Sequence, residues 1–285
     1  DSAQLRYIDS LKLEIQVAEI LKSEAEKRIN ALKVEIVKLS PPVYWKKGGL
    51  FALNLNQMSF TNWAAGDSDA LSVTTLGNMY ASYKKDKIDW DNNLVLAYGM
   101  IQNRGEDLRK NEDKIDFITK FGHHSPIRNV NFTVFANFRS QFAPAYNYDA
   151  QNVRSPLISN FLAPAFVVIS LGLDYKPKPY FSVYLSPATG KFTIVNINDN
   201  SIKKNFAVDT NKIVRPEFGA SMAMFFQKDL TKRINLLSRL GLFNNYTDPN
   251  KPNRKNIDVN FEVLIAGKIN RFISCLLYTS PSPRD

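Results

Sequence analysis

Alternation of apolar and polar residues, carried through about ten segments between Leu50 and Ile269, constrains this chain more than any other feature. In residues 131–141, for example, Phe132 and Val134 alternate with Asn131 and Thr133. A period of two indicates strands with one apolar and one polar face. The connectors between the segments alternate between short and long, which is typical of a transmembrane β-barrel. The pattern therefore predicts an all-β fold, an antiparallel barrel of the transmembrane type.

The expected strands number eleven. They cover residues 50–59, 71–83, 88–101, 114–122, 131–141, 163–175, 180–186, 213–226, 234–245 and 256–269, with an eleventh beginning after Asn270 and Arg271. Short turns are expected at 84–87, 125–129 and 176–179, and long connectors at 102–113, 142–160, 187–212 and 246–255. Bacterial barrels have an even number of strands, so an intact barrel would have about twelve. The sequence thus predicts that the last strand is missing here.

Composition agrees with this class of protein. The 285 residues contain 44% hydrophobic residues but no apolar run of about 18 residues, the length that a transmembrane helix requires. The longest apolar stretch, Ala163–Leu173, is too short and contains Pro164. A mean hydropathy of -0.26 remains compatible with a membrane barrel because only every second strand residue faces lipid.

The first 40 residues carry a different period. Residues at alternating spacings of three and four form a heptad seam that is apolar except at Lys22: Ile8, Leu11, Ile15, Ala18, Lys22, Ala25, Ile29, Leu32, Ile36 and Leu39. This predicts a helix over residues 4–39, ended by Pro41 and Pro42. Like charges would meet across a parallel dimer, Glu14 with Glu19 and Arg28 with Lys33, which favours another partner, an antiparallel pairing or a higher oligomer. The alternative is an amphipathic helix that lies on its own domain.

The predicted domains are a heptad-patterned helix at 1–40, a linker at 41–48, a barrel at 49–274 and a separate tail at 275–285. The tail begins at Cys275, the one cysteine, and resembles a translated sequencing adapter. This interpretation predicts that the native sequence is truncated near Ser274 and replaced by the tail. With short turns on the periplasmic side, the helix would also be periplasmic.

Each strand assigns its residues to two faces. The outward, apolar face is expected to carry Phe51, Leu53, Leu94, Leu96, Val134, Val167, Ile169, Leu171, Val259 and Val263. Candidate residues lining the lumen are Arg139, Arg215, Glu217, Arg239, Asp258, Glu262 and Lys268. Mixed charge is expected inside a barrel, either as ion pairs that fill a plugged lumen or as a lining that selects a solute. Arg239 and Glu262 are predicted to pair across neighbouring strands.

Aromatic residues concentrate beside the short turns. Tyr83 and Trp90 flank the first of these turns, and Phe121 and Phe132 flank the second. Tyr175, Tyr180, Phe226 and Phe272 occupy equivalent positions further along. Such a distribution indicates an aromatic girdle at a membrane interface, although soluble β-sandwiches also place aromatics at strand ends.

Catalytic and metal sites are not indicated. His123 and His124 are the only histidines, and adjacent residues of a strand point to opposite faces, which disfavours a shared metal ion. Both lie beside a short turn, an unfavourable place for the serine–histidine pair of a hydrolase. The net charge of +10 is scattered over connectors and lacks the basic stripe with aromatics that nucleic-acid binding requires. We expect no enzyme activity, no cofactor, no metal and no nucleic-acid partner.

Four segments carry a family resemblance: 53–66, 89–93, 137–146 and 180–191. The first reads Leu-Asn-Leu-Asn-Gln-Met-Ser-Phe-Thr-Asn-Trp-Ala-Ala-Gly and the last Tyr-Phe-Ser-Val-Tyr-Leu-Ser-Pro-Ala-Thr-Gly-Lys. They resemble a Bacteroidota family known as domain of unknown function 3078, over roughly residues 45–274. The resemblance implies an outer-membrane, β-barrel-like protein without established catalytic residues.

Three functions therefore compete. The first is an outer-membrane barrel with a structural, docking or narrow transport role, in contact with membrane lipid and with a periplasmic protein through its helix. The second is a soluble β-barrel that binds an apolar ligand. The third is an outer-membrane hydrolase. The sequence does not name a solute.

Overall fold

The computed structural model describes residues 2–39, 43–59, 69–148, 154–268, 270 and 274–279. It divides into two compact units, Asp1–Tyr44 and Trp45–Asp285. Pro41, Pro42, Phe272 and tail residues 280–285, on which parts of the sequence predictions depend, lie outside the described residues.

The first unit contains one helix, α1 (Ser2–Leu39). This confirms the continuous helix predicted over residues 4–39. Seam residues such as Ile15, Ile29 and Ile36 are all exposed. None of the helices within the described residues combines the length and apolar character needed to cross a membrane.

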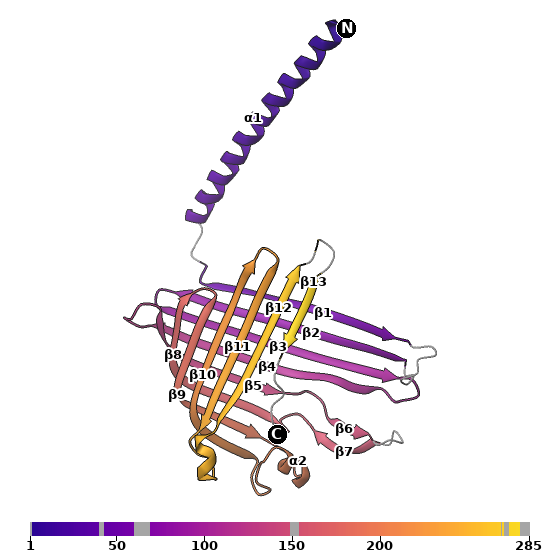
Figure 1. The fold of residues 1–285 in the computed structure, drawn as a ribbon, viewed down its shortest axis with the longest axis vertical. Coiled ribbons are helices and arrows are strands. Elements are labelled where there is room, and N and C mark those ends of the chain that lie inside the picture. Colours follow the sequence, from indigo (N-terminus) through magenta and orange to yellow (C-terminus); the bar gives the residue numbers. More distant parts are fainter. Residues whose placement is uncertain are drawn as a thin grey trace. The chain divides into compact units, whose positions relative to one another are not determined.

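The second unit is dominated by an antiparallel sheet of eleven strands (Figure 1). Its strands are β1 (Trp45–Met58), β2 (Ala70–Lys85), β3 (Ile88–Asn103), β4 (Arg109–His124), β5 (Val130–Ser140), β8 (Ala165–Lys178), β9 (Phe181–Ile194), β10 (Val214–Thr231), β11 (Ile234–Asn245), β12 (Ile257–Lys268) and β13 (Ser274–Thr279). Each strand pairs with the next one in this series. The eleven predicted strands and their antiparallel order are therefore confirmed.

Several strand limits differ from the prediction. β1 begins at Trp45, inside the expected linker, because residues 45–49 pair with Tyr83–Met79. β3 and β4 extend into the expected connector 102–113 and leave only residues 104–108, where Gly105 has φ +77°. β9 continues to Ile194 because its residues pair on both sides. Cys275, assigned to an unrelated tail, lies in β13 and pairs with Gly267.

The longest connectors also contain structure that the alternation did not predict. A separate hairpin, β6 (Ala145–Tyr148) with β7 (Arg154–Ser159), lies between β5 and β8. Helix α2 (Asn200–Asn205) lies between β9 and β10, and a 3-10 helix, η1 (Lys251–Lys255), lies between β11 and β12. These elements are too short for a period to be read from their sequences.

The sheet does not close into a barrel. Its terminal strands are β1 and β13, which are not paired with each other among the described residues. Eleven antiparallel strands leave the first and the last running in the same direction, so these two edges cannot complete an antiparallel ladder. The predicted antiparallel sheet is therefore present, but its strands are not closed into a barrel in this structure.

The sheet nevertheless curls strongly, and glycines lie at the irregular points. Register shifts occur beside Gly99, Gly172 and Gly219. A Cβ at Gly172 would lie 2.1 Å from the carbonyl oxygen of Leu185, so only glycine allows this close approach of β8 and β9. Such bulges bend strands and increase twist. As a result, residues of β4 and β5 line one cavity with residues of β11 and β12.

The conventional apolar core is small. Among the described residues, the one buried apolar cluster consists of Ala163, Val195, Ile202 and Val208, beside α2. Asp199 caps α2 by accepting hydrogen bonds from the backbone of Ser201 and Ile202 and from the Ser201 hydroxyl, and these bonds lower the pKa of its carboxyl group. The large sheet itself is held by its ladders and by polar contacts on its concave face.

Candidate binding pocket on the concave face

Strand register places all seven predicted lumen residues on one face of the sheet. Arg239 lies opposite Glu262 across β11 and β12. Arg215 and Glu217 are two residues apart on β10 and therefore point to the same face. Directly paired residues of neighbouring strands lie on the same face. Asp258 on β12 pairs with Phe243 on β11, Phe243 pairs with Ser221 on β10, and Ser221 pairs with Ser186 on β9, so these four residues share one face. We call this surface the concave face and its opposite the convex face.

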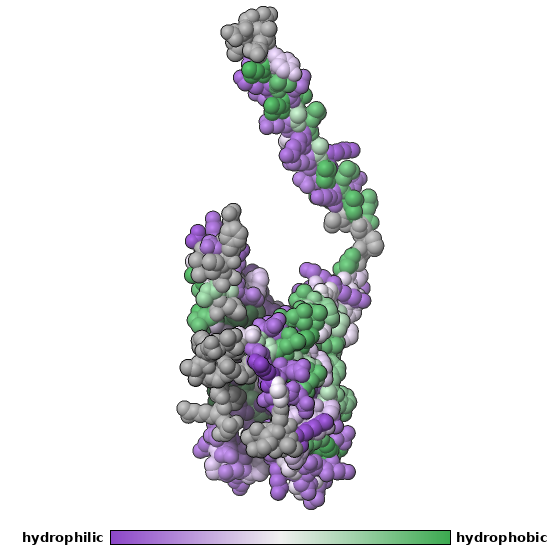
Figure 2. Space-filling view, turned by 90° about the vertical axis from the view of Figure 1, so that its right-hand side faces the viewer, coloured by the Kyte–Doolittle hydropathy of each residue, from purple (hydrophilic) through white to green (hydrophobic). Residues whose placement is uncertain are grey.

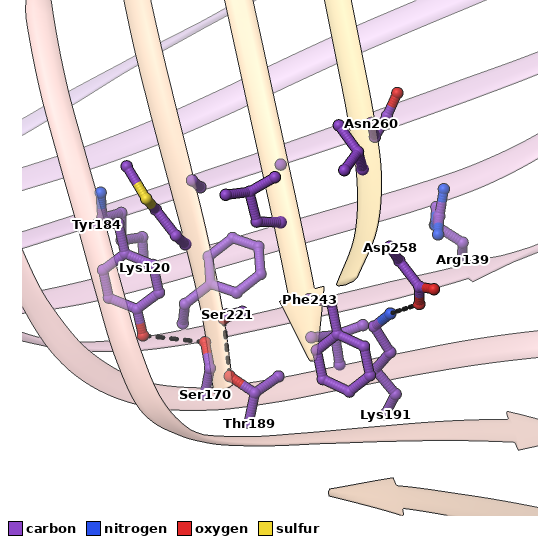
Figure 3. A pocket seen from close by; sticks show the side chains of 17 residues that line it. Lys120, Arg139, Ser170, Tyr184, Thr189, Lys191, Ser221, Phe243, Asp258 and Asn260 are labelled. Carbon is purple, nitrogen blue, oxygen red and sulfur yellow. Dashed lines mark hydrogen bonds and ion pairs between the residues drawn. The ribbon is translucent and has the colours of Figure 1, made fainter. Parts of the chain in front are cut away.

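A cavity of about 720 Å³ opens on the concave face (Figure 3). Of the seven predicted residues, Arg139 and Asp258 line it, whereas Arg215, Glu217, Arg239, Glu262 and Lys268 do not. The sequence interpretation did not identify the other polar lining residues: Lys120, Ser170, Tyr184, Thr189, Lys191, Ser221 and Asn260. Phe135, Val168 and Phe243 add apolar surface.

A buried carboxylate supports one wall of this cavity. Asp174 on β8 is only 1% exposed, and its Oδ2 lies 2.7 Å from Lys120 Nζ and 3.1 Å from Lys176 Nζ. Neither carboxylate oxygen has a well-aligned hydrogen bond within the described part of the chain. Attraction to two ammonium groups therefore compensates the cost of burying this charge. Lys120 also lies 5.5 Å from the centre of the Tyr184 ring.

Lys191 and Arg139 are the other two positively charged residues that line the cavity. Lys191 Nζ lies 3.4 Å from the centre of the Phe243 ring and 3.6 Å from Asp258 Oδ2. Asp258 is 76% exposed, so water competes for this ion pair. The Arg139 guanidinium lies 5.7 Å from the ring of Phe166, and no carboxylate of the described residues lies within 4.0 Å of it.

Hydroxyl groups at the base of the cavity bond to one another. Ser170 Oγ and Tyr184 Oη are 2.9 Å apart, and Thr189 Oγ1 lies 2.8 Å from Ser221 Oγ. Thr189 donates to Ser186 Oγ at 2.9 Å, and Ser186 donates to the carbonyl of Leu171 at 2.8 Å. The network joins β8, β9 and β10 and fixes the base of the cavity.

Four of the five predicted residues outside the cavity form ion pairs. Arg239 and Glu262 form the predicted ion pair, with a separation of 3.4 Å. Arg215 contacts Glu217 at 3.1 Å and Lys114 contacts Asp116 at 3.4 Å. Lys268 ends β12, away from the cavity. Outside the cavity, these contacts agree with the interpretation of the charges as structural ion pairs.

The convex face has the opposite composition. Register places all ten residues predicted to face outward on it, including Phe51 opposite Gly77 and Val134 opposite Leu171. Many are widely exposed: Phe51 is 73% exposed, Val259 60% and Leu53 57%. Figure 2 shows apolar residues gathered along the flank of the sheet, above a rim that is mainly hydrophilic.

Aromatic side chains group at one end of this face, beside the short turns. Trp45, at the start of β1, lies 5.1 Å from Tyr83 and 5.7 Å from Trp90 between ring centres. The ring centres of Tyr180 and Phe226 are 6.0 Å apart. The predicted clustering near the turns is present, and Trp45 extends it because β1 begins earlier than expected.

The two histidines lie in different surroundings. His124 Nε2 is 3.0 Å from Asp89 Oδ2, beside the turn between β2 and β3. His123 lies on the other face of β4, opposite Ile88 and Phe132. Within the described ranges, no three His, Cys, Asp or Glu side chains are close enough to hold a metal ion.

The fold and this cavity define an antiparallel β-sheet protein with a polar concave face and an apolar convex face. Residues 55–146 match a family model described as Protein of unknown function (DUF3078). The predicted family resemblance is confirmed over that stretch, which contains β2 to β5, while the segment 180–191 lies beyond it. No curated protein matches the chain.

Proposed function

We propose that this protein is an outer-membrane β-barrel protein of bacteria, with a structural, docking or narrow transport role and no catalytic step. One observation carries the proposal. The strands place their apolar residues on the exposed convex face and most of their charged residues on the concave face. A soluble protein distributes these residues in the opposite way.

The free-energy cost of exposing the apolar convex face to water supports this assignment. Apolar surface left in water costs about 25 cal/mol per Å², and soluble monomers rarely expose apolar patches beyond a few hundred Å². Exposed apolar residues occur on strands from β1 to β13, including Phe51, Phe132, Ile169, Val259 and Leu277. Lipid would remove this cost, and the aromatic cluster of Trp45, Tyr83 and Trp90 would then lie at a membrane interface.

Closure of the barrel forms a second part of the proposal. Because β1 and β13 run in the same direction, one further strand between them would complete an antiparallel barrel of about twelve strands. Short turns such as residues 86–87 and 232–233 would face the periplasm, and the long connectors with β6–β7, α2 and η1 would face outward. Helix α1 would then lie in the periplasm, where its exposed heptad seam could bind a partner helix.

The soluble alternative is less well supported. A soluble barrel for an apolar ligand needs an apolar interior, but the cavity is lined by Lys120, Arg139 and Lys191 as well as by hydroxyl groups. Phe135 and Phe243 supply only part of its surface.

Fractionation of the full-length native protein tests the proposal. We expect it in the outer-membrane fraction, resistant to extraction by carbonate, and migrating differently on gels before and after heating. Recovery as a stable monomer without detergent would contradict the membrane assignment. Deletion of residues 1–40 tests the helix separately: the heat-dependent migration should persist while co-purification of a periplasmic partner is lost.

A further inference from the structure

We infer that the concave-face cavity binds a small organic anion, an apolar body that carries a carboxylate or phosphate group. This inference concerns the ligand class of the cavity and depends on the pocket alone, not on membrane insertion.

The first argument is an excess of positive charge. Lys120, Arg139 and Lys191 line the cavity, and Lys176 lies behind it on Asp174. Among the described residues, Asp258 is the one carboxylate of the lining, and Asp174 behind it is shared by Lys120 and Lys176. Three further carboxylates, Asp91, Asp116 and Glu217, lie opposite the lining cations on neighbouring strands. Asp116 and Glu217 are themselves paired with Lys114 and Arg215, so the lining keeps its excess of positive charge.

The second argument is the availability of particular donors. Arg139 is one of the lining residues drawn in Figure 3, and no carboxylate in the described part of the chain lies within 4.0 Å of its guanidinium. A guanidinium presents parallel donors that match both oxygens of a carboxylate or phosphate. Lys191 has a single, long contact with the exposed Asp258, so an incoming anion can replace that carboxylate at little cost.

The third argument concerns the body of the ligand. Phe135, Val168 and Phe243 give the cavity apolar walls, and its volume of about 720 Å³ falls within the range usual for small-molecule sites. The hydroxyl groups of Ser170, Tyr184, Thr189 and Ser221 are already bonded to one another. Charge and apolar contact, rather than new hydroxyl bonds, would therefore select the ligand.

Three matched probes test the charge requirement. The purified full-length protein is titrated with 4-(trifluoromethyl)benzoate, the corresponding benzyl alcohol and the corresponding benzylamine, with binding followed by fluorine NMR. We expect the anion to bind at least tenfold more tightly than the alcohol, and the amine to bind more weakly still. Phenyl phosphate and inorganic phosphate form a second comparison, in which phenyl phosphate should bind more tightly because it also contacts the apolar walls.

Variants locate the site. R139Q and K191Q should each weaken benzoate binding about tenfold, because each substitution removes a charged donor that the anion would contact. D258N should strengthen it severalfold by removing the competing carboxylate from Lys191. K204Q, at an exposed position of α2, should leave the affinity unchanged and serves as the control for net charge.

Equal affinity for the benzoate and the alcohol would overturn the inference. So would an unchanged benzoate affinity in R139Q or K191Q, or a weaker one in D258N. Because Asp258 is widely exposed, D258N keeps the test decisive if another variant fails to fold. Outer-membrane fractionation is a separate readout, so failure of anion binding would be distinguishable from failure of the membrane proposal.

Discussion

The two faces of the sheet are built by the same strands but are stabilised by different means. On the convex face, exposed apolar side chains such as Phe51 and Val259 make few contacts that would favour folding in water. On the concave face, Asp174 is buried between two lysines and Arg239 pairs with Glu262. The comparison shows that period-two alternation fixes which residues share a face, while the surroundings of each face decide which one is the interior.

The largest expected effect comes from placing a charge on each face at neighbouring positions of β1. Leu53, 57% exposed, lies on the convex face and Asn54, also exposed, on the concave face. L53R should cost about 2–4 kcal/mol of folding free energy in lipid, whereas N54R should cost less than about 1 kcal/mol. Urea titration of folding in lipid vesicles measures both. Equal costs for the two variants would contradict the assignment of the convex face to lipid.

Removal of the buried carboxylate should have the next largest effect. D174N leaves Lys120 and Lys176 without their shared counter-charge and should destabilise the sheet by about 2 kcal/mol, below the value for a fully buried pair because Lys176 is partly exposed. The same unfolding assay measures it. D258N, which removes an exposed carboxylate of the same face, is the matched control and should stay close to the native stability.

The ion pair that the sequence predicts should contribute less. Arg239 is 58% exposed and its contact with Glu262 is 3.4 Å long, so solvent screens the attraction. A double-mutant cycle with R239Q and E262Q should give a coupling free energy of about 0.5 kcal/mol. A coupling above about 2 kcal/mol would indicate that this part of the concave face is dry.

The smallest expected effect on stability concerns Asp199, the residue that caps α2, which belongs to neither face of the sheet. Hydrogen bonds lower the pKa of Asp199 in the folded state, so its contribution to stability is present above the unfolded pKa, near 3.9. That contribution is lost as the pH falls through the folded value. Amide hydrogen exchange at Ile202 should therefore accelerate at strongly acidic pH in the native protein. The D199N variant, whose side chain does not ionise, should not show this pH dependence.

The faces and strand order were predictable because alternation is a local signal. The register that follows from alternation predicts Arg239 opposite Glu262, and the two residues pair across β11 and β12. The cavity was not predictable in the same way. Lys120, Lys191 and Tyr184 line one cavity on a sheet that bends at bulges near Gly172 and Gly219, and curvature leaves no periodic trace in the sequence. Asp174 directly follows the apolar stretch Ala163–Leu173, and its partner Lys120 lies two strands away in the sheet, so no local pattern indicates that they pair.

The order of the strands in the large sheet has a consequence for how the protein folds. Every ladder joins strands that follow one another in the sheet series, and only β5 and β8 are separated by an inserted hairpin. Loop closure between neighbours costs little entropy, so each hairpin can form on the edge left by the previous one. Assembly can then proceed as a growing ribbon, in which each new strand also covers the edge that would otherwise pair with another chain.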